Sequence, residues 1–273
     1  RGPAAGAAAA GAASVHGVSL TQRKGECVVV TGPSGCGKTT LARMVNGLIP
    51  AVYAGEAEGS VRVFGRAIAD WEMDDLSCAV GSVFQNPRSQ FFNLDTTSEI
   101  AFGCENMGIP RDEIAHRIAS TTCALGIDHL LERDIRALSG GEKQLVAVAS
   151  VHAMEPSAFV LDEPTAALDV RAMLRLRNAV ARLKAAGKTI LIAEHRLWWL
   201  RGVADRIVLM RDGAVVAEMA AEEFAQMPVE ARRRLGLRAW DIEQVEPRAS
   251  GAFRENPRQS AERTPALVVR GLS

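Results

Sequence analysis

The amino-acid sequence predicts an α/β fold with a mainly parallel sheet. Short unbroken apolar runs, such as residues 27–30, recur along the chain and alternate with amphipathic segments such as 171–184. Runs of this kind are typical of strands that are covered on both faces. Residues 61–64 indicate a small antiparallel β patch, and the stretch 85–154 changes to a helical pattern. We therefore expect a helical lobe inserted into the α/β core.

The expected elements follow one another in a regular order. Strands are predicted at residues 27–30, 80–84, 159–162, 189–193 and 206–210, and helices after Thr39, at 111–125, from about 141 to 153 and at 171–184. Pro110 precedes the helix at 111–125 and Gly126 follows it, and these residue types favour the start and the end of a helix. Alternation of strands and helices is the pattern of a parallel sheet.

The first functional motif follows the first strand. Residues 32–39 read G-P-S-G-C-G-K-T and match the Walker A pattern G-x-x-x-x-G-K-[ST] in the required strand–loop–helix context. Gly35 and Gly37 let the backbone wrap around an anion, so that N–H groups and the helix N-terminus point at phosphate. Lys38 is expected to meet the β- and γ-phosphates, and the Thr39 hydroxyl to bind Mg²⁺. The residues predicted to bind ATP or GTP are Gly32, Pro33, Ser34, Gly35, Cys36, Gly37, Lys38, Thr39 and Thr40.

A carboxylate for the metal is predicted at the end of the apolar run 159–162. Asp162 closes this run, where it would hold Mg²⁺ through water, and Glu163 follows it immediately. Successive side chains of an extended chain point to opposite faces, so Glu163 is placed to polarise the attacking water as a general base. An apolar run that ends in Asp-Glu is also a common end of an ordinary strand. Its combination with Lys38 favours the catalytic interpretation.

Further motifs match a known family in their order along the chain. Gln85 lies in V-F-Q-N-P, residues 138–144 read L-S-G-G-E-K-Q, Asp169 lies in A-L-D, and His195 lies in A-E-H-R. With the phosphate loop, these motifs make the chain resemble a nucleotide-binding subunit of the ABC transporter superfamily over roughly residues 18–220. The resemblance implies a P-loop NTPase core that hydrolyses ATP. It makes Gln85 a ligand of Mg²⁺ and a sensor of the γ-phosphate, and His195 the switch histidine that contacts this phosphate.

The family signature predicts a second nucleotide contact. Ser139, Gly140 and Gly141 open a helix with Glu142 in its first turn, so the N–H groups and the serine hydroxyl form an anion-binding tip. One chain cannot easily bring this tip and its own phosphate loop to one nucleotide. The resemblance implies that each ATP lies between the Walker motifs of one module and the signature of another, with Asp169 in the D-loop of this interface. ATP would close such a dimer, and hydrolysis would open it.

Longer strings resemble a narrower group. Three strings are similar to those of the ATPases of energy-coupling factor (ECF) transporters. They are F-Q-N-P-R-S-Q-F-F (84–92), E-I-A-F-G-C-E-N (99–106) and I-A-E-H-R-L-W-W-L (192–200). This resemblance implies uptake of vitamins or transition-metal ions, with a transmembrane coupling protein and a small substrate-capture membrane protein as partners. Related importer ATPases for other solutes share pieces of these strings. Phe91 and Phe92 either line a groove for the coupling protein or pack in the core.

The composition argues against several other functions. The chain has 32 Lys and Arg residues and 32 Asp and Glu residues, so its formal net charge is zero. No overall positive charge therefore recruits nucleic acid. A helix that crosses a bilayer needs about 18 consecutive apolar residues, and no apolar run in this sequence is that long. The five cysteines form no C-x-x-C pair. We expect a reduced protein at the cytoplasmic face of the cell membrane, attached through its partners. One alternative is a soluble ABC ATPase of translation or DNA repair, although basic patches and heptads are missing. The other is a non-hydrolysing switch, which the intact Lys38 and Glu163 disfavour.

The two ends of the chain differ from the core in composition. The predicted division is a flexible low-complexity start at 1–17, an ATP-binding domain at 18–222 with its lobe at about 86–154, and a helical or linker segment at 223–265. Residues 266–273 resemble the opening strand of another ABC module, which implies the start of a second module there. An ordinary C-terminal strand is the alternative for the last segment. The charges between Glu222 and Arg234 are expected to form a solvated face or a linker.

The base of the nucleotide lacks an expected partner. Related ATPases usually stack an aromatic residue on adenine from a loop ahead of the phosphate loop, but residues 1–31 contain no Phe, Tyr or Trp. Only His16 offers a ring in this region. We therefore expect nucleotide binding that depends on the phosphates and discriminates poorly between bases.

Overall fold

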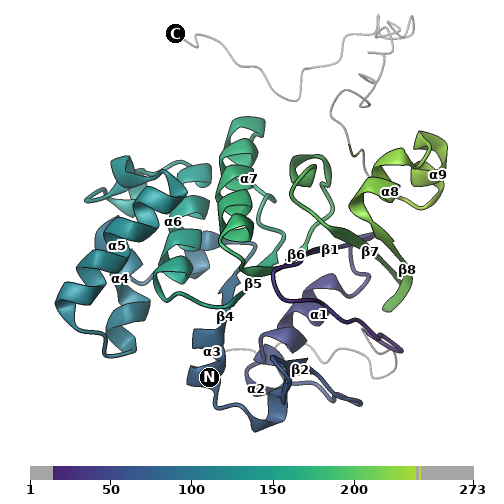
Figure 1. Cartoon of the computed structure of the whole chain (residues 1–273), viewed down its shortest axis with the longest axis horizontal. Coiled ribbons are helices and arrows are strands. Elements are labelled where there is room, and N and C mark those ends of the chain that lie inside the picture. The colour runs from purple at the N-terminus through teal and green to yellow at the C-terminus, as the bar shows by residue number, and fades with distance from the viewer. Residues whose placement is uncertain (1–14, 238–239, 241–273) are drawn as a thin grey trace, which may run out of the picture.

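The chain folds around a six-stranded sheet with helices on both faces (Figure 1). The computed structural model describes residues 15–237 and Trp240. The strand order is β4-β5-β6-β1-β7-β8, and every neighbouring pair is parallel except β7 with β8. The strands are β1 (Cys27–Thr31), β4 (Val80–Val83), β5 (Ala158–Asp162), β6 (Thr189–Ala193), β7 (Arg206–Arg211) and β8 (Ala214–Ala220). The predicted α/β fold with a mainly parallel sheet is confirmed.

The central strand β1 shows why these strands have no polar face. Its residues alternate between two hydrophobic clusters on opposite sides of the sheet, with Val28 in one and Val29 in the other. The helix α1 (Lys38–Val45) covers the side of Val28, and α7 (Val170–Ala185) covers the side of Val29. A fully buried aliphatic side chain contributes about 1.5–3 kcal/mol to stability. This two-sided core therefore holds the strand ends, and the loops that follow them, in fixed positions.

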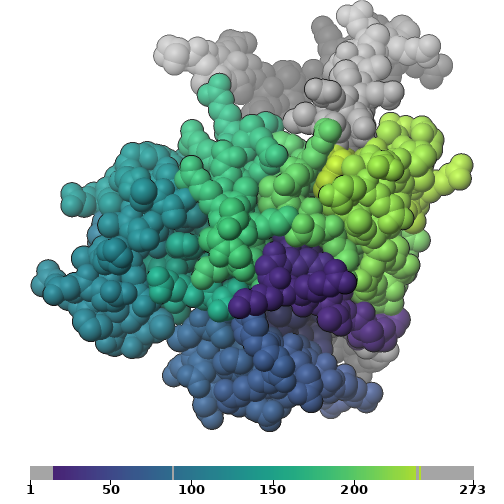
Figure 2. All heavy atoms as spheres, viewed as in Figure 1, coloured from purple at the N-terminus to yellow at the C-terminus, as the bar shows by residue number. Residues whose placement is uncertain are grey.

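A helical lobe is inserted between β4 and β5, as predicted. It consists mainly of α4 (Thr96–Asn106), α5 (Arg111–Leu125) and α6 (Gly140–Ala153), which pack on one another at one side of the molecule (Figures 1 and 2). The helix α5 has the predicted bounds. The antiparallel patch is formed by β2 (Arg62–Val63) and β3 (Arg66–Ala67). The shorter helices α2 (Leu48–Ala51) and α3 (Met73–Ala79) precede and follow this patch along the chain.

One strand at the sheet edge was not predicted. The strand β8 pairs antiparallel with β7 through a tight turn at Asp212 and Gly213, whose φ angles are 48° and 83°. Two left-handed residues in a row match the twist of a β-hairpin. The residues of β8 are partly buried or exposed, because the strand lies at the edge of the sheet. Such a run gives a weaker apolar signal than a strand that is buried on both faces.

The segment after β8 was predicted to be helical or a linker, with its charges on a solvated face. It contains the helices α8 (Ala221–Gln226) and α9 (Val229–Arg234), and most of its charged residues are exposed, but not all. Phe224 and Arg232 are both buried, and the Arg232 guanidinium lies 5.9 Å from the centroid of the Phe224 ring. Trp240 meets the same ring edge-on at 5.2 Å. A long charged side chain can cover apolar surface with its stem, which charge patterning alone does not show. The predictions for residues 1–14 and 241–273 lie outside the described residues.

Candidate functional site

The predicted phosphate loop connects the buried end of β1 to α1. Gly32 has a φ of 151°, and a Cβ there would lie 2.1 Å from the carbonyl oxygen of Met210 on the neighbouring strand β7. Only glycine fits this close approach. Gly37 has a left-handed φ of 100° and directly precedes the helix, which has no side-chain cap at this end. The first N–H groups of α1 are therefore available to an anion.

The Lys38 ammonium group lies inside this loop. Its side chain is 4 % exposed, and Nζ lies 4.0 Å from Glu163 Oε1. Nζ donates to the carbonyl oxygens of Gly32 and Pro33, both at 3.0 Å. A buried ammonium group needs acceptors around it. The loop supplies them from its own backbone and so keeps the cation where phosphate oxygens would enter.

An oxygen pair that suits a hard cation lies beside the loop. The Thr39 hydroxyl donates to Asp162 Oδ1 at 2.9 Å and joins the first turn of α1 to the end of β5. Burial raises the pKa of Asp162, and the nearby charge of Glu163 acts in the same direction, while the Thr39 hydrogen bond opposes both. Hydroxyl and carboxylate oxygens are the ligand types that Mg²⁺ prefers.

Glu163 lies where three strand ends meet. It follows β5, and its backbone N–H donates to the carbonyl oxygen of Ala193 at the end of β6, at 2.8 Å. Gln85, which comes two residues after β4, donates from Nε2 to Glu163 Oε2 at 3.2 Å. His195 Nδ1 lies 3.8 Å from Glu163 Oε1. The structure thus brings the predicted residues Lys38, Gln85 and His195 to one carboxylate.

Sequence reasoning missed two buried polar residues next to this carboxylate. Glu194 and Thr165 are both 0 % exposed. Glu194 Oε2 accepts a hydrogen bond from the Thr165 hydroxyl, and Oε1 accepts one from the backbone N–H of His195. A signal that could have found Glu194 is its position directly after a fully apolar strand. A carboxylate persists in such a place only when it is hydrogen-bonded.

The signature forms the start of α6 and packs against the start of α7. Ser139 caps α6 in a reciprocal capping box: its hydroxyl accepts from Glu142 N–H at 3.3 Å, and its own N–H donates to Glu142 Oε2 at 2.8 Å. Hydrogen bonds from Ser139 lower the pKa of Glu142. Asp169 caps α7 by accepting from Ala172 N–H at 2.7 Å. A Cβ on Gly141 would lie 2.5 Å from Ala172 Cβ, so the two helix N-termini are in direct contact.

The two adjacent phenylalanines that follow Gln85 have different surroundings. Phe91 is partly buried and packs against the main hydrophobic cluster. Phe92 is 74 % exposed and stacks on Phe102 with ring centroids 4.8 Å apart. Of the two alternatives in the sequence analysis, core packing is therefore correct for Phe91 but not for Phe92.

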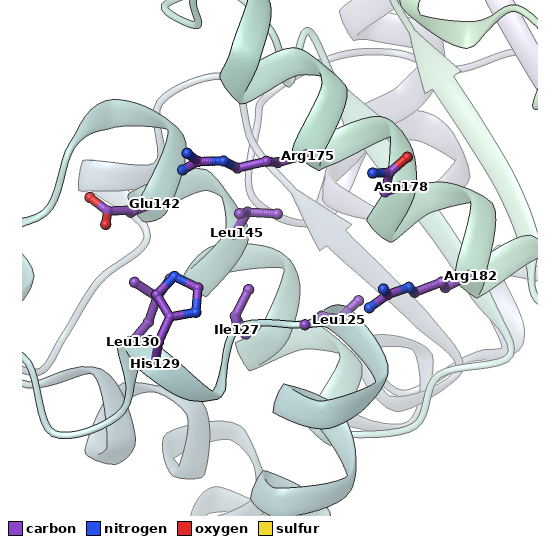
Figure 3. A pocket seen from close by; sticks show the side chains of 10 residues that line it. Leu125, Ile127, His129, Leu130, Glu142, Leu145, Arg175, Asn178 and Arg182 are labelled. Carbon is purple, nitrogen blue, oxygen red and sulfur yellow. The ribbon is translucent and has the colours of Figure 1, made fainter.

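A pocket of about 450 Å³ lies between the helical lobe and α7 (Figure 3). Its polar lining consists of Arg175, Asn178 and Arg182 from α7, opposite Glu142 and His129. Arg182 donates to the carbonyl oxygen of Ala124 at 2.9 Å, and Glu142 pairs with Arg133 at 3.2 Å. None of residues 32–40 lines the pocket. It is therefore separate from the phosphate loop, although Glu142 of the signature lines it.

The fold and the site together define a class of protein. A glycine-rich loop connects a buried strand to a helix and surrounds a lysine ammonium group. Two carboxylates lie at the end of a nearby parallel strand. This is the arrangement of a P-loop nucleoside triphosphatase. Residues 15–166 match the family model described as ABC transporter. The chain belongs to this family and is an ABC-type ATP-binding domain. The predicted family, the fold class and ATP as the nucleotide are confirmed.

Individual relatives agree with this assignment. An ABC transporter ATP-binding protein of Treponema denticola is 45 % identical over 228 residues, which cover 84 % of this chain and 47 % of the relative. Another, of Methanosarcina acetivorans, is 37 % identical over 246 residues, covering 90 % of this chain and 40 % of the relative. The chain thus spans about half the length of these relatives or less.

Solved structures with the same fold include two ABC ATPases. The structure of cbiO1 from Clostridium perfringens, described as part of the ABC transporter complex cbiONQ, has a TM-score of 0.71 at 30 % identity and covers 82 % of this chain and 89 % of that one. The ATP-binding cassette MJ1267 in its ADP conformation has a TM-score of 0.68 at 28 % identity and covers 77 % and 86 % of the two chains.

Proposed function

We propose that this domain hydrolyses ATP to drive a membrane importer of the ECF kind, which takes up a vitamin or a transition-metal ion. The observation that carries the proposal is the convergence of Lys38, Gln85 and His195 on the Glu163 carboxylate, beside an oxygen pair for a metal. The carboxyl ends of the central strands thus bring together a cation for phosphate, ligands for a metal, a base and an imidazole. These are the groups that phosphoryl transfer to water requires.

In this proposal the loop at 32–40 and Lys38 hold the β- and γ-phosphates of ATP. Thr39, Asp162 and Gln85 supply the oxygen ligands for Mg²⁺, and the contact between Thr39 and Asp162 supports this assignment. When bound, the ion neutralises negative charge on the phosphates. Asp162 must be deprotonated to act as a ligand, so its raised pKa is expected to weaken metal binding at acidic pH.

The hydrolytic step is assigned to Glu163 and His195. Glu163 accepts a proton from the water that attacks the γ-phosphorus, and ADP leaves on the opposite side. The hydrogen bond from Gln85 orients the Glu163 carboxylate and connects it to the start of the helical lobe. His195 contacts the γ-phosphate and keeps the water in line.

A second ABC module is proposed to complete each site. Ser139 and Gly140 are exposed at the N-terminus of α6, so the anion-binding tip faces outward. Asp169 lies at the start of the adjoining helix α7 and belongs to the same face. A partner that presents its own phosphate loop to this face would place ATP between the two modules. The partner is a second copy, a related chain or a further domain of the same polypeptide.

The ECF assignment rests on sequence strings and on the likeness to cbiO1. The strings at 84–92, 99–106 and 192–200 resemble those of ECF ATPases, and cbiO1 is described as part of a transporter complex. Among the residues that the structure describes, no helix is long and apolar enough to cross a membrane. We propose attachment to the cytoplasmic face of the membrane through a transmembrane coupling protein and a small substrate-capture protein.

Purification of the tagged chain from membranes of its own organism tests this proposal. We expect a complex with one transmembrane coupling protein and one small membrane protein, identified by mass spectrometry, whose ATPase activity is lost in a Lys38→Ala complex. Recovery of a soluble solute-binding protein instead would indicate another class of importer. Recovery of ribosomes or DNA without membrane proteins would support the soluble alternative and contradict a transport role.

A further inference from the structure

We propose that Glu194 is a positioning residue that fixes the switch histidine His195 beside Glu163 and joins it to the segment that leads to Asp169. The proposal rests on the proposed hydrolysis and adds to it a residue that touches no nucleotide. Glu194 lies directly after the apolar strand β6 and is 0 % exposed. Burial of an unpartnered carboxylate is strongly unfavourable. Its partners therefore indicate what it does.

Both oxygens of the Glu194 carboxylate are hydrogen-bonded. Oε1 accepts from the backbone N–H of His195 at 2.8 Å and from that of Arg196 at 2.9 Å. Oε2 accepts from the Thr165 hydroxyl. Thr165 is itself fully buried and lies two residues after Glu163. One carboxylate thus joins the turn after β6 to the turn after β5.

Arg196 makes a second connection between the same two turns. Its Nη1 donates to the carbonyl oxygens of Thr165 and Leu168, both at 3.4 Å. Leu168 directly precedes Asp169, which caps α7. We call Glu194, Arg196, Thr165 and Leu168 the strand-end clamp. The clamp links the switch histidine to the residues that face a partner module in the proposed dimer.

The clamp determines where the imidazole ring of His195 lies. Nδ1 is 3.4 Å from Glu194 Oε1 and 3.8 Å from Glu163 Oε1, so the ring lies between the buried carboxylate and the proposed base. The same Glu194 oxygen also holds the His195 backbone. Any shift of this carboxylate therefore moves both the backbone and the ring. A misplacement of about 1 Å can lower a rate by up to about a hundredfold.

Paired substitutions on both sides of the hydrogen bond test the proposal. Thr165→Val keeps the side-chain shape but removes the hydroxyl, and Glu194→Ala removes every acceptor. Both are expected to lower kcat between about tenfold and a hundredfold while the Kd for ATP changes less than about threefold. Thr165→Ser keeps the hydroxyl. Glu194→Gln keeps one oxygen for the two backbone N–H groups, and its amide group can donate to the Thr165 oxygen. Both variants are expected to stay within about threefold of the wild-type kcat. If Glu194→Ala does not fold, Thr165→Val alone still tests the proposal.

Glu26→Ala is the matched control for a purely structural role. Glu26 precedes β1 at the opposite end of the sheet, is mostly buried, and accepts hydrogen bonds from Arg206 and from the Arg23 backbone. Its loss is expected to lower the melting temperature but not the kcat of the folded protein. Equal kcat losses in Glu26→Ala and Thr165→Val would show that the clamp acts only on stability, and would overturn the proposal.

Two further measurements separate the clamp from the proposed function. In a His195→Ala background, Thr165→Val is expected to change kcat less than about twofold, because the clamp acts through His195. An undiminished effect there overturns the proposal. Independently of hydrolysis, the NMR signals of the His195 ring and of the His195 and Arg196 amides are expected to shift or broaden in Thr165→Val but not in Thr165→Ser. Unchanged signals overturn the clamp, whereas absence of Lys38-dependent hydrolysis in the wild type contradicts only the proposed function.

Discussion

Glu163 adopts a backbone conformation that a residue with a long side chain rarely takes. Its φ of 43° lies in the left-handed region, which costs roughly 1–2 kcal/mol for an L-residue other than glycine. The hydrogen bond from its N–H to Ala193 holds it there. In this conformation its carboxylate meets Gln85 and lies near Lys38. This placement supports the proposed role of Glu163 as the general base.

The first prediction tests this carboxylate. Glu163→Gln keeps the shape and the contact with Gln85 but cannot accept the proton of water. We expect unchanged ATP affinity, turnover lowered by roughly a hundredfold or more, and accumulation of a closed ATP-bound dimer. Calorimetry, an ATPase assay and size-exclusion chromatography with ATP measure the three properties. Lys38→Ala, in contrast, should lose nucleotide binding itself. Hydrolysis by Glu163→Gln at the wild-type rate would show that Glu163 is not the base.

The second prediction concerns the nucleotide base. Residues 1–31 contain no Phe, Tyr or Trp. The His16 ring is engaged with the carbonyl oxygen of Asp212, which lies 2.8 Å from Nε2. Base stacking contributes about 1–3 kcal/mol, so its absence should weaken binding roughly tenfold and reduce the preference for ATP over GTP. Calorimetric titrations with both nucleotides, and with His16→Ala, measure this. A large preference for ATP that persists in His16→Ala would point to another group that holds the base.

Site residues differ in how far the sequence predicts them. Lys38 and Thr39 are the first two residues of α1, directly after the phosphate loop, so their relation is set by local spacing. The contact between Gln85 and Glu163 spans 78 positions, and that between Thr165 and Glu194 spans 29. These contacts exist because β4, β5 and β6 are neighbours in the sheet. The family motifs indicate Gln85 and Glu163, but nothing in the sequence alone indicates Thr165.

At the scale of elements, the contact between α6 and α7 decides how the signature is presented. Gly141 lies so close to Ala172 that an added Cβ would be 2.5 Å from the alanine Cβ, whereas a Cβ on Gly140 would meet only the Ala167 carbonyl oxygen at 3.6 Å. Two consecutive glycines therefore have different roles. Gly141 permits the packing of the two helices, and Gly140 leaves the exposed face of the tip open.

The third prediction follows from this difference. Gly141→Ala should lower the free energy of unfolding by about 1–3 kcal/mol, because α6 and α7 must move apart. Gly140→Ala should leave stability unchanged or raise it by up to about 1 kcal/mol, since alanine is the better helix former and an ordinary contact is made. Urea unfolding of both variants measures the difference. Equal effects of the two substitutions would show that the contact with Ala172 does not restrict the helices.

The elements that the sequence predicts have either strong burial or clear flanking residues. The parallel strands are buried on both faces, and the long helix α5 has flanking Pro110 and Gly126, so their patterns are local and clear. The edge strand β8 was not predicted, and for α8 and α9 the sequence indicated only a helical or linker segment, because their formation depends on packing against β7 and around Phe224. A pattern read along the chain contains no information on such distant contacts.

At the scale of the whole molecule, the described chain supplies one phosphate loop and one outward-facing signature tip. Lys38 is the first residue of α1 and Glu163 directly follows β5, whereas Ser139 caps a helix of the inserted lobe. The relatives from Treponema denticola and Methanosarcina acetivorans are about twice as long as this chain. Their length is compatible with a site shared between two modules. The proposed dimer therefore makes activity depend on association, and this dependence can be tested without knowing the membrane partners.

The last prediction uses two inactive variants of the isolated chain. Lys38→Ala disables the phosphate loop, and Gly140→Asp adds a negative charge to the exposed tip, which suits a helix N-terminus but repels phosphate. Each alone should be inactive. In an equal mixture of homodimer-forming chains, half of the dimers are mixed and each holds one intact site, so activity should return to at most about a quarter of the wild-type value. The wild-type rate should also rise faster than linearly with protein concentration. Two results together would contradict the shared site: the mixture stays inactive, and the wild type, verified as a monomer, has a specific activity that does not depend on concentration. They would show that one chain builds a complete site by itself.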